Sequence, residues 1–236
     1  MNLLLFETRA NEVLLPLGDP RAVHVREVLR LLPSDDFDVA VVNGSRGKAT
    51  IVEDGPTGLR ISFRWEDFAE DNRLPIHLLA GLPRPQTARK ILEQAATIGV
   101  TSMDFFGADK GEPSYADSKL WMSEEWHRHL VRGVEQAFCS FLPAVRHYAN
   151  LEDALAELPQ DTSRFALDVY EAPAPLSVTD ATTVLVLALG PERGWSGRER
   201  NLLRDAGFAL RHLGSRVLRQ ETACIAALGI LASRQW

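Results

Sequence analysis

Short apolar runs separated by turn residues dominate the first 65 residues of the chain. The segment Leu59–Trp65 alternates apolar and polar side chains with a period of two, which is typical of a half-buried strand. Two earlier apolar runs are joined by the sequence Gly-Ser-Arg-Gly at 44–47, which predicts a hairpin. The strands expected in this region are Leu3–Phe6, Val13–Leu15, Val39–Asn43, Ala49–Glu53 and Leu59–Trp65.

One helix is predicted to interrupt these strands, from Pro20 to Leu32, and Pro33 prevents it from continuing. The apolar side chains that would share one face of this helix are Val25, Val28, Leu29 and Leu32. Arg26 and Arg30 are four residues apart, so they would also share a face. Five short strands and one helix favour a small β-barrel.

The acidic and polar segment Glu66–Asn72, followed by Pro75, separates this region from a second pattern, in which strands and helices alternate. Strands are expected at Ile76–Leu82, Met103–Phe106, Phe165–Val169, Thr182–Leu189 and Phe208–Leu213. Helices are expected at Gln86–Ile98, Lys119–Phe138, Leu151–Leu158, Ser196–Ala206 and Gln220–Arg234. This alternation predicts an α/β domain whose mostly parallel sheet is covered on both faces.

The composition is that of a soluble globular protein, with 236 residues, 45% of them hydrophobic and 25% charged. No apolar run approaches the roughly 18–20 residues that cross a bilayer. The N-terminal segment has no basic flank before its apolar stretch, so it does not resemble a signal peptide. Two distant cysteines provide no zinc framework, and the GxGxxG, HExxH and GxSxG motifs are absent. We therefore expect cytoplasmic residence and no metal site.

Positive charge is concentrated near the carboxyl end, although the net charge of the chain is −6. Seven arginines lie between Arg193 and Arg219, against only Glu199 and Asp205. Arginine binds phosphate and stacks on bases better than lysine does, so the cluster favours a nucleic-acid partner. A solvated helix face is the alternative interpretation of such a cluster.

Two glycine-containing loops follow predicted strands in this same region. The first is Gly-Pro-Glu-Arg-Gly-Trp-Ser at 190–196, and the second is Leu-Gly-Ser-Arg-Val-Leu-Arg-Gln-Glu-Thr-Ala at 213–223. Loops at the carboxyl ends of parallel strands are where α/β sheets bind ligands. The alternatives are a structural strand-to-helix turn for the first loop and a helix cap for the second. Two such loops at one sheet edge indicate a site.

The two loops resemble motifs of the SPOUT-class methyltransferases, specifically the bacterial family that methylates N3 of a uridine in 16S ribosomal RNA. The second loop matches that family's pattern without a break, and the sequence LGPERGWS at 189–196 resembles its first loop. The segments His24–Arg30, Ile91–Val100 and Glu135-Gln136 are also similar to family motifs. Three departures are Arg193 in place of glycine, an altered continuation at 137–142 and an altered segment at 103–110.

The resemblance implies a PUA-like RNA-binding β-barrel at residues 1–70 and a SPOUT domain at 73–236, with a deep trefoil knot near 188–236. It implies S-adenosyl-L-methionine as cofactor, ribosomal RNA of the small subunit as partner, and a homodimer. The implied cofactor-binding residues are Leu189, Gly190, Glu192, Gly194, Leu213, Gly214, Val217 and Leu218. Arg21, His24, Arg26 and Arg30 of the N-terminal region are the candidate RNA contacts.

Three residues of the second loop are candidates for catalysis. N3 of uracil carries a proton at neutral pH, so it needs a base or a cation that stabilises the developing anion. We expect Arg219 to provide that cation, Glu221 to act as a possible base and Arg216 to contact phosphate or base, while Thr222 could simply cap the last helix. The alternatives are the same fold acting on tRNA or 23S ribosomal RNA, and a non-catalytic RNA-binding or ribosome-assembly factor.

Overall fold

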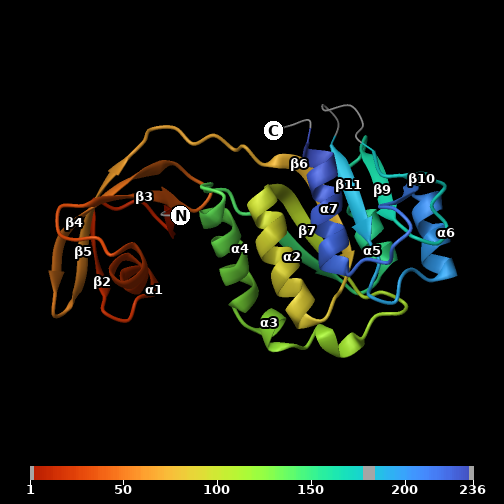
Figure 1. The fold of residues 1–236 in the computed structure, drawn as a ribbon, viewed down its shortest axis with the longest axis horizontal. Helices are drawn as coiled ribbons and strands as arrows, with labels where there is room; N and C mark the ends of the chain where they lie inside the picture. The colour runs from red at the N-terminus through yellow and green to blue at the C-terminus, as the bar shows by residue number, and fades with distance from the viewer. Residues whose placement is uncertain (1–2, 178–183, 234–236) are drawn as a thin grey trace. The chain divides into compact units, whose positions relative to one another are not determined.

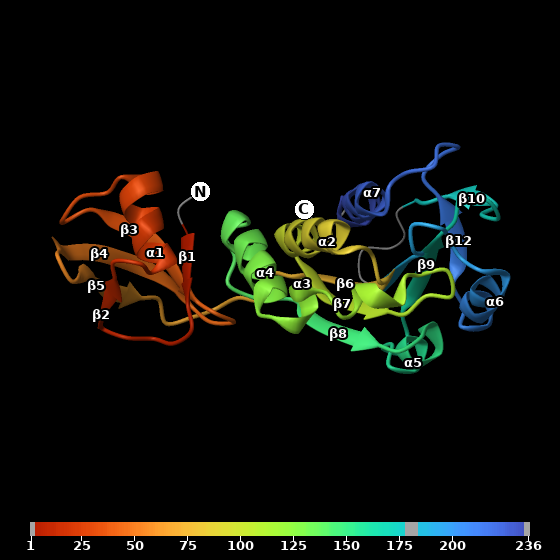
Figure 2. The same cartoon turned by 90° about the horizontal axis from the view of Figure 1, so that it is seen from below.

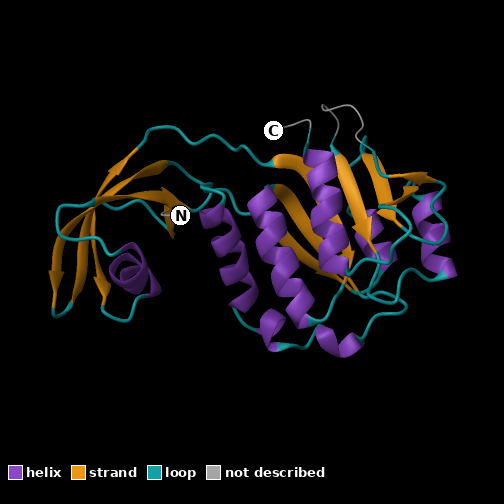
Figure 3. Ribbon diagram, in the orientation of Figure 1, coloured by secondary structure: helices purple, strands orange, loops and turns teal. Residues whose placement is uncertain are grey.

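A computed structural model describes residues 3–177 and 184–233 of the chain. The ends of two predicted elements, Thr182 and Arg234, lie outside the described residues. The chain forms two compact units by the contacts among its Cα atoms. The first contains the residues up to Asn72 together with Val134–Leu142, and the second contains Arg73–Gly133 and the residues from Pro143 onward. Figures 1, 2 and 3 show the elements of both units.

A five-stranded mixed sheet forms the first unit. Its strands are β1 (Leu3–Phe6), β2 (Glu12–Pro16), β3 (Asp36–Val41), β4 (Arg46–Gly55) and β5 (Gly58–Trp65), and their spatial order is β1-β3-β4-β5-β2. The predicted hairpin is confirmed as the antiparallel pair β3–β4. Strands β1 and β2 are the two ends of this order in the described residues, so closure into a barrel stays a prediction.

The predicted helix from Pro20 to Leu32 is wrong in its geometry. The chain forms a short helix α1 (Pro20–Val23) and then a π-helix η1 (His24–Leu29). The wider turn of a π-helix rotates successive side chains away from their α-helical positions. Val25 is therefore fully buried, whereas Val28, predicted on the same face, is 63% exposed.

The predicted common face of Arg26 and Arg30 is wrong for the same reason. Arg30 follows the π-helix with a left-handed backbone, at φ 56°, so it is no longer part of any helix. Its side chain is exposed. The spacing rule for neighbouring side chains on an α-helix does not apply across such a break.

Seven parallel strands form the sheet of the second unit. They are β6 (Leu74–Gly81), β7 (Val100–Phe106), β8 (Ala144–Tyr148), β9 (Ser163–Leu167), β10 (Ala174–Pro175), β11 (Leu185–Leu189) and β12 (Ala209–His212). Their spatial order is β10-β12-β9-β11-β6-β7-β8. Every residue of β11 is buried, as expected for a strand between two helical layers. The predicted parallel α/β sheet is thus confirmed.

Helices cover both faces of this sheet (Figures 1 and 2). The helices of the second unit are α2 (Pro85–Ile98), η2 (Pro113–Tyr115), α3 (Lys119–Met122), α4 (Glu125–Gln136, whose last turn belongs to the first unit), α5 (Leu151–Ala156), α6 (Gly197–Asp205) and α7 (Gln220–Ala232). Helix α7 packs against α2 on one face, and α5 and α6 lie on the other. None of the helices in the described residues is long and apolar enough to cross a membrane.

The predicted single helix Lys119–Phe138 is wrong, because the chain breaks at Ser123 into α3 and α4. Ser123 has an extended backbone, and its hydroxyl accepts a hydrogen bond from the backbone N–H of Glu125 at 3.3 Å. Serine favours such side-chain bonds over continuation of a helix. Farther along, α4 lies so close to α2 that a Cβ atom at Gly133 would sit 2.3 Å from the carbonyl oxygen of Glu93.

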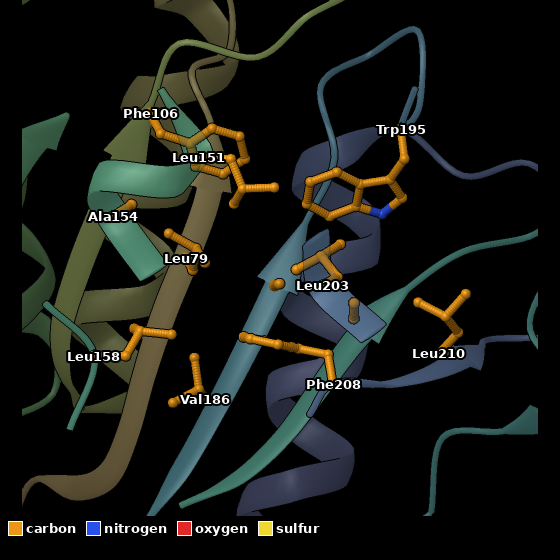
Figure 4. Close-up of a cluster of buried hydrophobic side chains, with 12 residues drawn as sticks. Leu79, Phe106, Leu151, Ala154, Leu158, Val186, Trp195, Leu203, Phe208 and Leu210 are labelled. Atoms are coloured by element: carbon orange, nitrogen blue, oxygen red, sulfur yellow. The ribbon is translucent and has the colours of Figure 1, made fainter. Parts of the chain in front are cut away.

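The core on the α5 and α6 face of the sheet contains the largest fully buried side chain, Trp195 (Figure 4). Its indole ring lies parallel to the ring of Phe106, with centroids 6.0 Å apart. Leu151 and Ala154 of α5 and Leu203 of α6 belong to the same cluster. This core lies directly beneath the first of the two glycine-containing loops.

Candidate functional site

A cavity of about 260 Å³ opens at the carboxyl ends of three adjacent strands, β12, β9 and β11. Parallel pairing places Leu167, the last residue of β9, opposite Leu189 of β11 and Arg211 of β12. The loops that follow these strands therefore leave the sheet at one edge and at one level. The two glycine-containing loops meet here, as the sequence predicts.

The first glycine-containing loop is fixed at both ends. Gly194 has a left-handed backbone (φ 69°), and its N–H donates to the carbonyl of Pro191 at 2.8 Å. The indole N–H of Trp195 donates to the carbonyl of Leu167 at 2.8 Å, which ties this loop to the end of β9. A Cβ atom at Gly190 would lie 3.2 Å from the Trp195 ring, so glycine permits this close approach.

Helix α6 begins directly after this loop with a capping box. Ser196 accepts from the backbone N–H of Glu199, and the Glu199 carboxylate accepts from the backbone N–H of Ser196. The other oxygen of Glu199 accepts from the backbone N–H of Asp109, in the loop after β7, at 3.0 Å. The prediction that Ser196 is the N-cap is confirmed, and Glu199 is completely buried.

The second glycine-containing loop is more exposed and leads into α7. Gly214 has φ 106°, and its N–H donates to Nδ1 of His212 at 3.1 Å. Arg219 is the N-cap residue of α7 and makes no side-chain capping bond, so neither Ser215 nor Thr222 acts as the cap. Gln220 donates through Nε2 to the carbonyl of Gly81 at 2.8 Å, and its buried Oε1 has no partner in the described residues.

The cavity brings together most of the residues proposed from the sequence. All eight candidate cofactor-binding residues line it: Leu189, Gly190, Glu192, Gly194, Leu213, Gly214, Val217 and Leu218. Of the candidate catalytic residues, Arg216 lines the cavity, while Arg219 and Glu221 lie at the start of α7 and outside the cavity lining.

Glu221 is buried and paired with a lysine. Its Oε1 accepts from Nζ of Lys90 at 3.0 Å. Burial acts to raise the pKa of the Glu221 carboxyl, but a backbone N–H, Lys90 and Arg219 together lower it below its ordinary value. Glu221 is therefore ionised at neutral pH.

A third loop, which the sequence did not reveal as part of the site, completes the cavity after β9. Asp168 is buried and accepts from Nε of Arg200 on α6 at 2.5 Å. Burial acts to raise the pKa of Asp168, yet Arg200 and the backbone N–H groups of Tyr170 and Glu171 lower it below its ordinary value of 3.8. The only hint in the sequence was the position of Asp168 at the end of a predicted strand.

The carboxyl-terminal arginines divide into paired and unpaired groups. Arg198 binds Asp109 and Glu152, Arg200 binds Asp168, and Arg204 binds Glu171. Arg211 donates to the carbonyl of Leu210. Arg193 and Arg216 both line the cavity, are exposed, and have no ion-pair partner in the described ranges. Part of the cluster is thus structural, and part faces the cavity mouth.

In the first unit, the candidate RNA contacts are Arg21, His24, Arg26 and Arg30. Arg21 is paired with Asp19 at 2.7 Å, and Arg26 with Asp54 at 2.6 Å. Burial lowers the pKa of the His24 imidazole, which favours its neutral form. Arg30 is exposed, and no ion pair engages it within the described residues.

No group of three or more His, Cys, Asp or Glu side chains is placed to hold a metal ion in residues 3–177 and 184–233. The polar groups at the cavity include backbone amides and carbonyls of the glycine loops, the unpaired guanidinium groups of Arg193 and Arg216, and the unpartnered Oε1 of Gln220. The other polar side chains of the lining are those of Asp168, Tyr170, Glu192, Arg200, Arg211 and His212. Such a lining is suited to a flat, hydrogen-bonding organic ligand.

Comparison with known proteins gives a consistent result. Residues 70–232 match the family model described as an RNA methyltransferase domain. The chain is 32% identical to the ribosomal RNA small subunit methyltransferase E of Treponema pallidum, over 98% of this chain and 90% of that protein. It is 28% identical to ribosomal RNA small subunit methyltransferase E 1 of Borreliella burgdorferi, over 99% and 98% of the two chains.

Solved structures share the fold over the whole chain. The ribosomal RNA small subunit methyltransferase E from Neisseria gonorrhoeae, bound to S-adenosyl methionine, has a TM-score of 0.82 and 20% identity, and the match covers 100% of this chain and 98% of that one. A putative methyltransferase from Legionella pneumophila, in complex with the same cofactor, has a TM-score of 0.79 and 21% identity, with 98% and 97% covered.

The buried pair of Asp168 and Arg200 gives a prediction about stability. Asp168→Asn leaves Arg200 with only the partly exposed carboxylate of Glu171, 3.4 Å away, as a counter-charge. The free energy of unfolding should therefore fall by about 1–3 kcal/mol at pH 7, the cost of losing the hydrogen bond between buried charged groups. Because the folded pKa of Asp168 is lowered, its contribution is complete above pH 4 and is lost as the pH falls through the folded value. The difference between wild type and variant in urea unfolding should therefore shrink toward pH 3.

The matched control is Asp205→Asn, the same substitution at an exposed carboxylate of α6. It should change the unfolding free energy by no more than about 0.5 kcal/mol. Equal losses in the two variants would contradict a stabilising role for the buried pair.

Proposed function

This chain belongs to the RNA methyltransferase family, and we propose that it transfers a methyl group from S-adenosylmethionine to N3 of a uridine in 16S ribosomal RNA. The observation that carries the proposal is the meeting of the loops at 189–195 and 211–218 around one cavity. The names of its relatives support the ribosomal substrate. The choice of N3 rests on the resemblance of the second loop to the uridine-N3 family.

The cavity fits the proposed cofactor. The glycine loops expose backbone amides and carbonyls that can bind an adenine edge, and Gln220 offers a buried acceptor for an N–H or O–H donor. When bound, S-adenosylmethionine supplies a methyl group on a positively charged sulfur. The residues proposed to hold it are Leu189, Gly190, Glu192, Gly194, Leu213, Gly214, Val217 and Leu218.

The chain must supply a reactive nucleobase in the correct position. Arg219 and Arg216 are proposed to stabilise the negative charge that develops on the uracil oxygens as N3 loses its proton. Glu221 is the proposed proton acceptor, since its lowered pKa keeps it ionised at neutral pH. The bond from Lys90 reduces the basicity of Glu221, so charge stabilisation by the arginines should contribute more to the rate.

The function is tested by methyl transfer. The protein is incubated with radiolabelled S-adenosylmethionine and unmodified small ribosomal subunits, protein-free 16S ribosomal RNA, 23S ribosomal RNA or tRNA. We expect label in 16S ribosomal RNA, and mass spectrometry of nucleosides should identify 3-methyluridine. Label only in tRNA or 23S ribosomal RNA would favour the alternative substrates. Failure to bind the cofactor in calorimetry would favour a non-catalytic RNA-binding or assembly factor.

The role of Arg219 gives a second test. Arg219→Ala should lower kcat by about 10²–10³-fold, the usual effect of removing one group that stabilises transition-state charge. The dissociation constant for S-adenosylmethionine should stay within about twofold, because Arg219 does not line the cavity. Arg132→Ala, an exposed arginine of α4 away from the cavity, is the control and should retain kcat. An equal loss of cofactor binding and transfer would contradict this role.

We propose that the first unit is the PUA-like RNA-binding domain, with a division of the chain near residues 70–73. Arg21, His24, Arg26 and Arg30 are its proposed RNA contacts. Arg30 is the one most available to a phosphate, since Arg21 and Arg26 already bind carboxylates.

The salt dependence of binding tests this proposal. The affinity for 16S ribosomal RNA should fall steeply with salt, and Arg30→Ala should reduce the slope of log K against log salt by about one. Arg60→Ala is the control in the same unit, because Glu12 and Glu53 engage that side chain. A slope that does not change with Arg30→Ala would reject the contact.

Two further features are proposed on the same resemblance, a deep trefoil knot near 188–236 and a homodimer, and cytoplasmic residence is proposed on the sequence features given above. The bond from Gln220 to Gly81 and the packing of α7 on α2 hold the last helix against the start of the second unit, a contact that a threaded helix would also require. Val217, which lines the cavity, is 73% exposed although it is apolar, and this supports an interface there.

A further inference from the structure

Tyr170 lies on the loop after β9, at the mouth of the cavity. Its side chain is 74% exposed, although it is a large aromatic ring, and it is among the residues that line the cavity. No other ring and no cation lies against it in the described part of the chain. Its faces are therefore open to a flat partner.

The position of Tyr170 is fixed by a buried carboxylate. The backbone N–H of Tyr170 donates to Oδ1 of Asp168 at 2.7 Å, and that of Glu171 donates to the same oxygen at 3.0 Å. The other oxygen of Asp168 binds Arg200, which is itself buried. Because this backbone is already held in place, little further conformational entropy is lost when the Tyr170 side chain binds a ligand.

The charged side chains of the cavity lining have a positive balance, which favours an anionic partner. Arg193 and Arg216 have no carboxylate partner in the described residues, and both line the same cavity. The negative charge of Asp168 is compensated by Arg200, and Glu171 is occupied by Arg204. Glu192 also lines the cavity and accepts from the backbone N–H of Arg84, so one carboxylate faces the two free guanidinium groups and the balance stays positive. An open aromatic ring beside free guanidinium groups is the combination that binds single-stranded nucleic acid.

We propose that Tyr170 is a stacking platform for a nucleobase of the RNA, with Arg193 and Arg216 placed to bind the adjoining phosphates. This inference rests on the proposed function, because it assumes that RNA reaches this cavity. The RNA base is a better partner than the adenine of the cofactor, since Tyr170 lies outside both glycine-containing loops and three quarters of its side chain faces solvent. Stacking would hold a base that has left its pair close to the cavity.

The test compares Tyr170→Phe, Tyr170→Leu and Tyr170→Ala with wild type. The first keeps an aromatic ring, the second keeps an apolar side chain without one, and the third removes the side chain. Stacking on a base is worth about 1–3 kcal/mol, so the Leu and Ala variants should lose roughly 5- to 150-fold in kcat/KM for 16S ribosomal RNA. Tyr170→Phe should remain within about twofold of wild type.

Two further measurements identify which base is bound. Calorimetry should give an unchanged dissociation constant for S-adenosylmethionine in all three variants. Filter binding of a single-stranded RNA oligonucleotide should weaken in the Leu and Ala variants alone. Met122→Ala is the matched control, because Met122 is 75% exposed in the same unit but does not line the cavity, and it should leave all three measurements unchanged.

Several outcomes would overturn the inference. Wild-type values for Tyr170→Ala would show that the ring binds no base, and weakened cofactor binding with normal RNA binding would assign the ring to adenine. An equal loss in Tyr170→Phe would assign the effect to the hydroxyl. If the wild-type protein transferred no methyl group to 16S ribosomal RNA, the proposed function would fail, and the oligonucleotide measurement would still decide whether Tyr170 stacks on RNA.

Discussion

Parallel pairing of β12, β9 and β11 is the constraint on which the cavity depends. Leu167 is paired with Leu189 on one side and with Arg211 on the other. The three loops that follow these strands therefore begin next to one another at the same edge of the sheet. Trp195 then joins two of these loops through its bond to the carbonyl of Leu167. The pairing of the strands therefore determines where the cavity forms, and the side chains of the loops determine its charge and shape.

Much of this arrangement could be predicted from the sequence, because its signals are local. A run of apolar residues that ends in glycine, as at Leu185–Gly190, specifies both a buried strand and the loop after it. The serine and glutamate at 196 and 199 specify the start of α6 in the same way. The segments that were predicted incorrectly involve helix geometry. The break at Ser123 depends on a side-chain hydrogen bond that competes with the helix. The π-helix at His24–Leu29 has no such bond at its start, and the spacing of apolar residues does not distinguish its wider turn from an α-helix.

Other parts of the site could not be predicted because they depend on contacts between distant segments. Asp168 and Arg200 are 32 residues apart, and nothing in their neighbouring sequence marks them as partners. The same is true of Glu221 and Lys90, which are 131 residues apart. Counting arginines overstated the available charge for this reason, since ion pairs occupy Arg198, Arg200 and Arg204.

The carboxylate of Glu199 connects two parts of the second unit that are far apart in the chain. One of its oxygens holds the start of α6, and the other holds the backbone of Asp109, which lies after β7. The carboxylate of Asp109 in turn accepts from Ser196 and Arg198, so each of the two segments both donates hydrogen bonds to the other and accepts them from it. A substitution in the segment after β7 would therefore alter the start of α6 and, through it, the wall of the cavity. This segment and α6 should be changed together when the enzyme is redesigned.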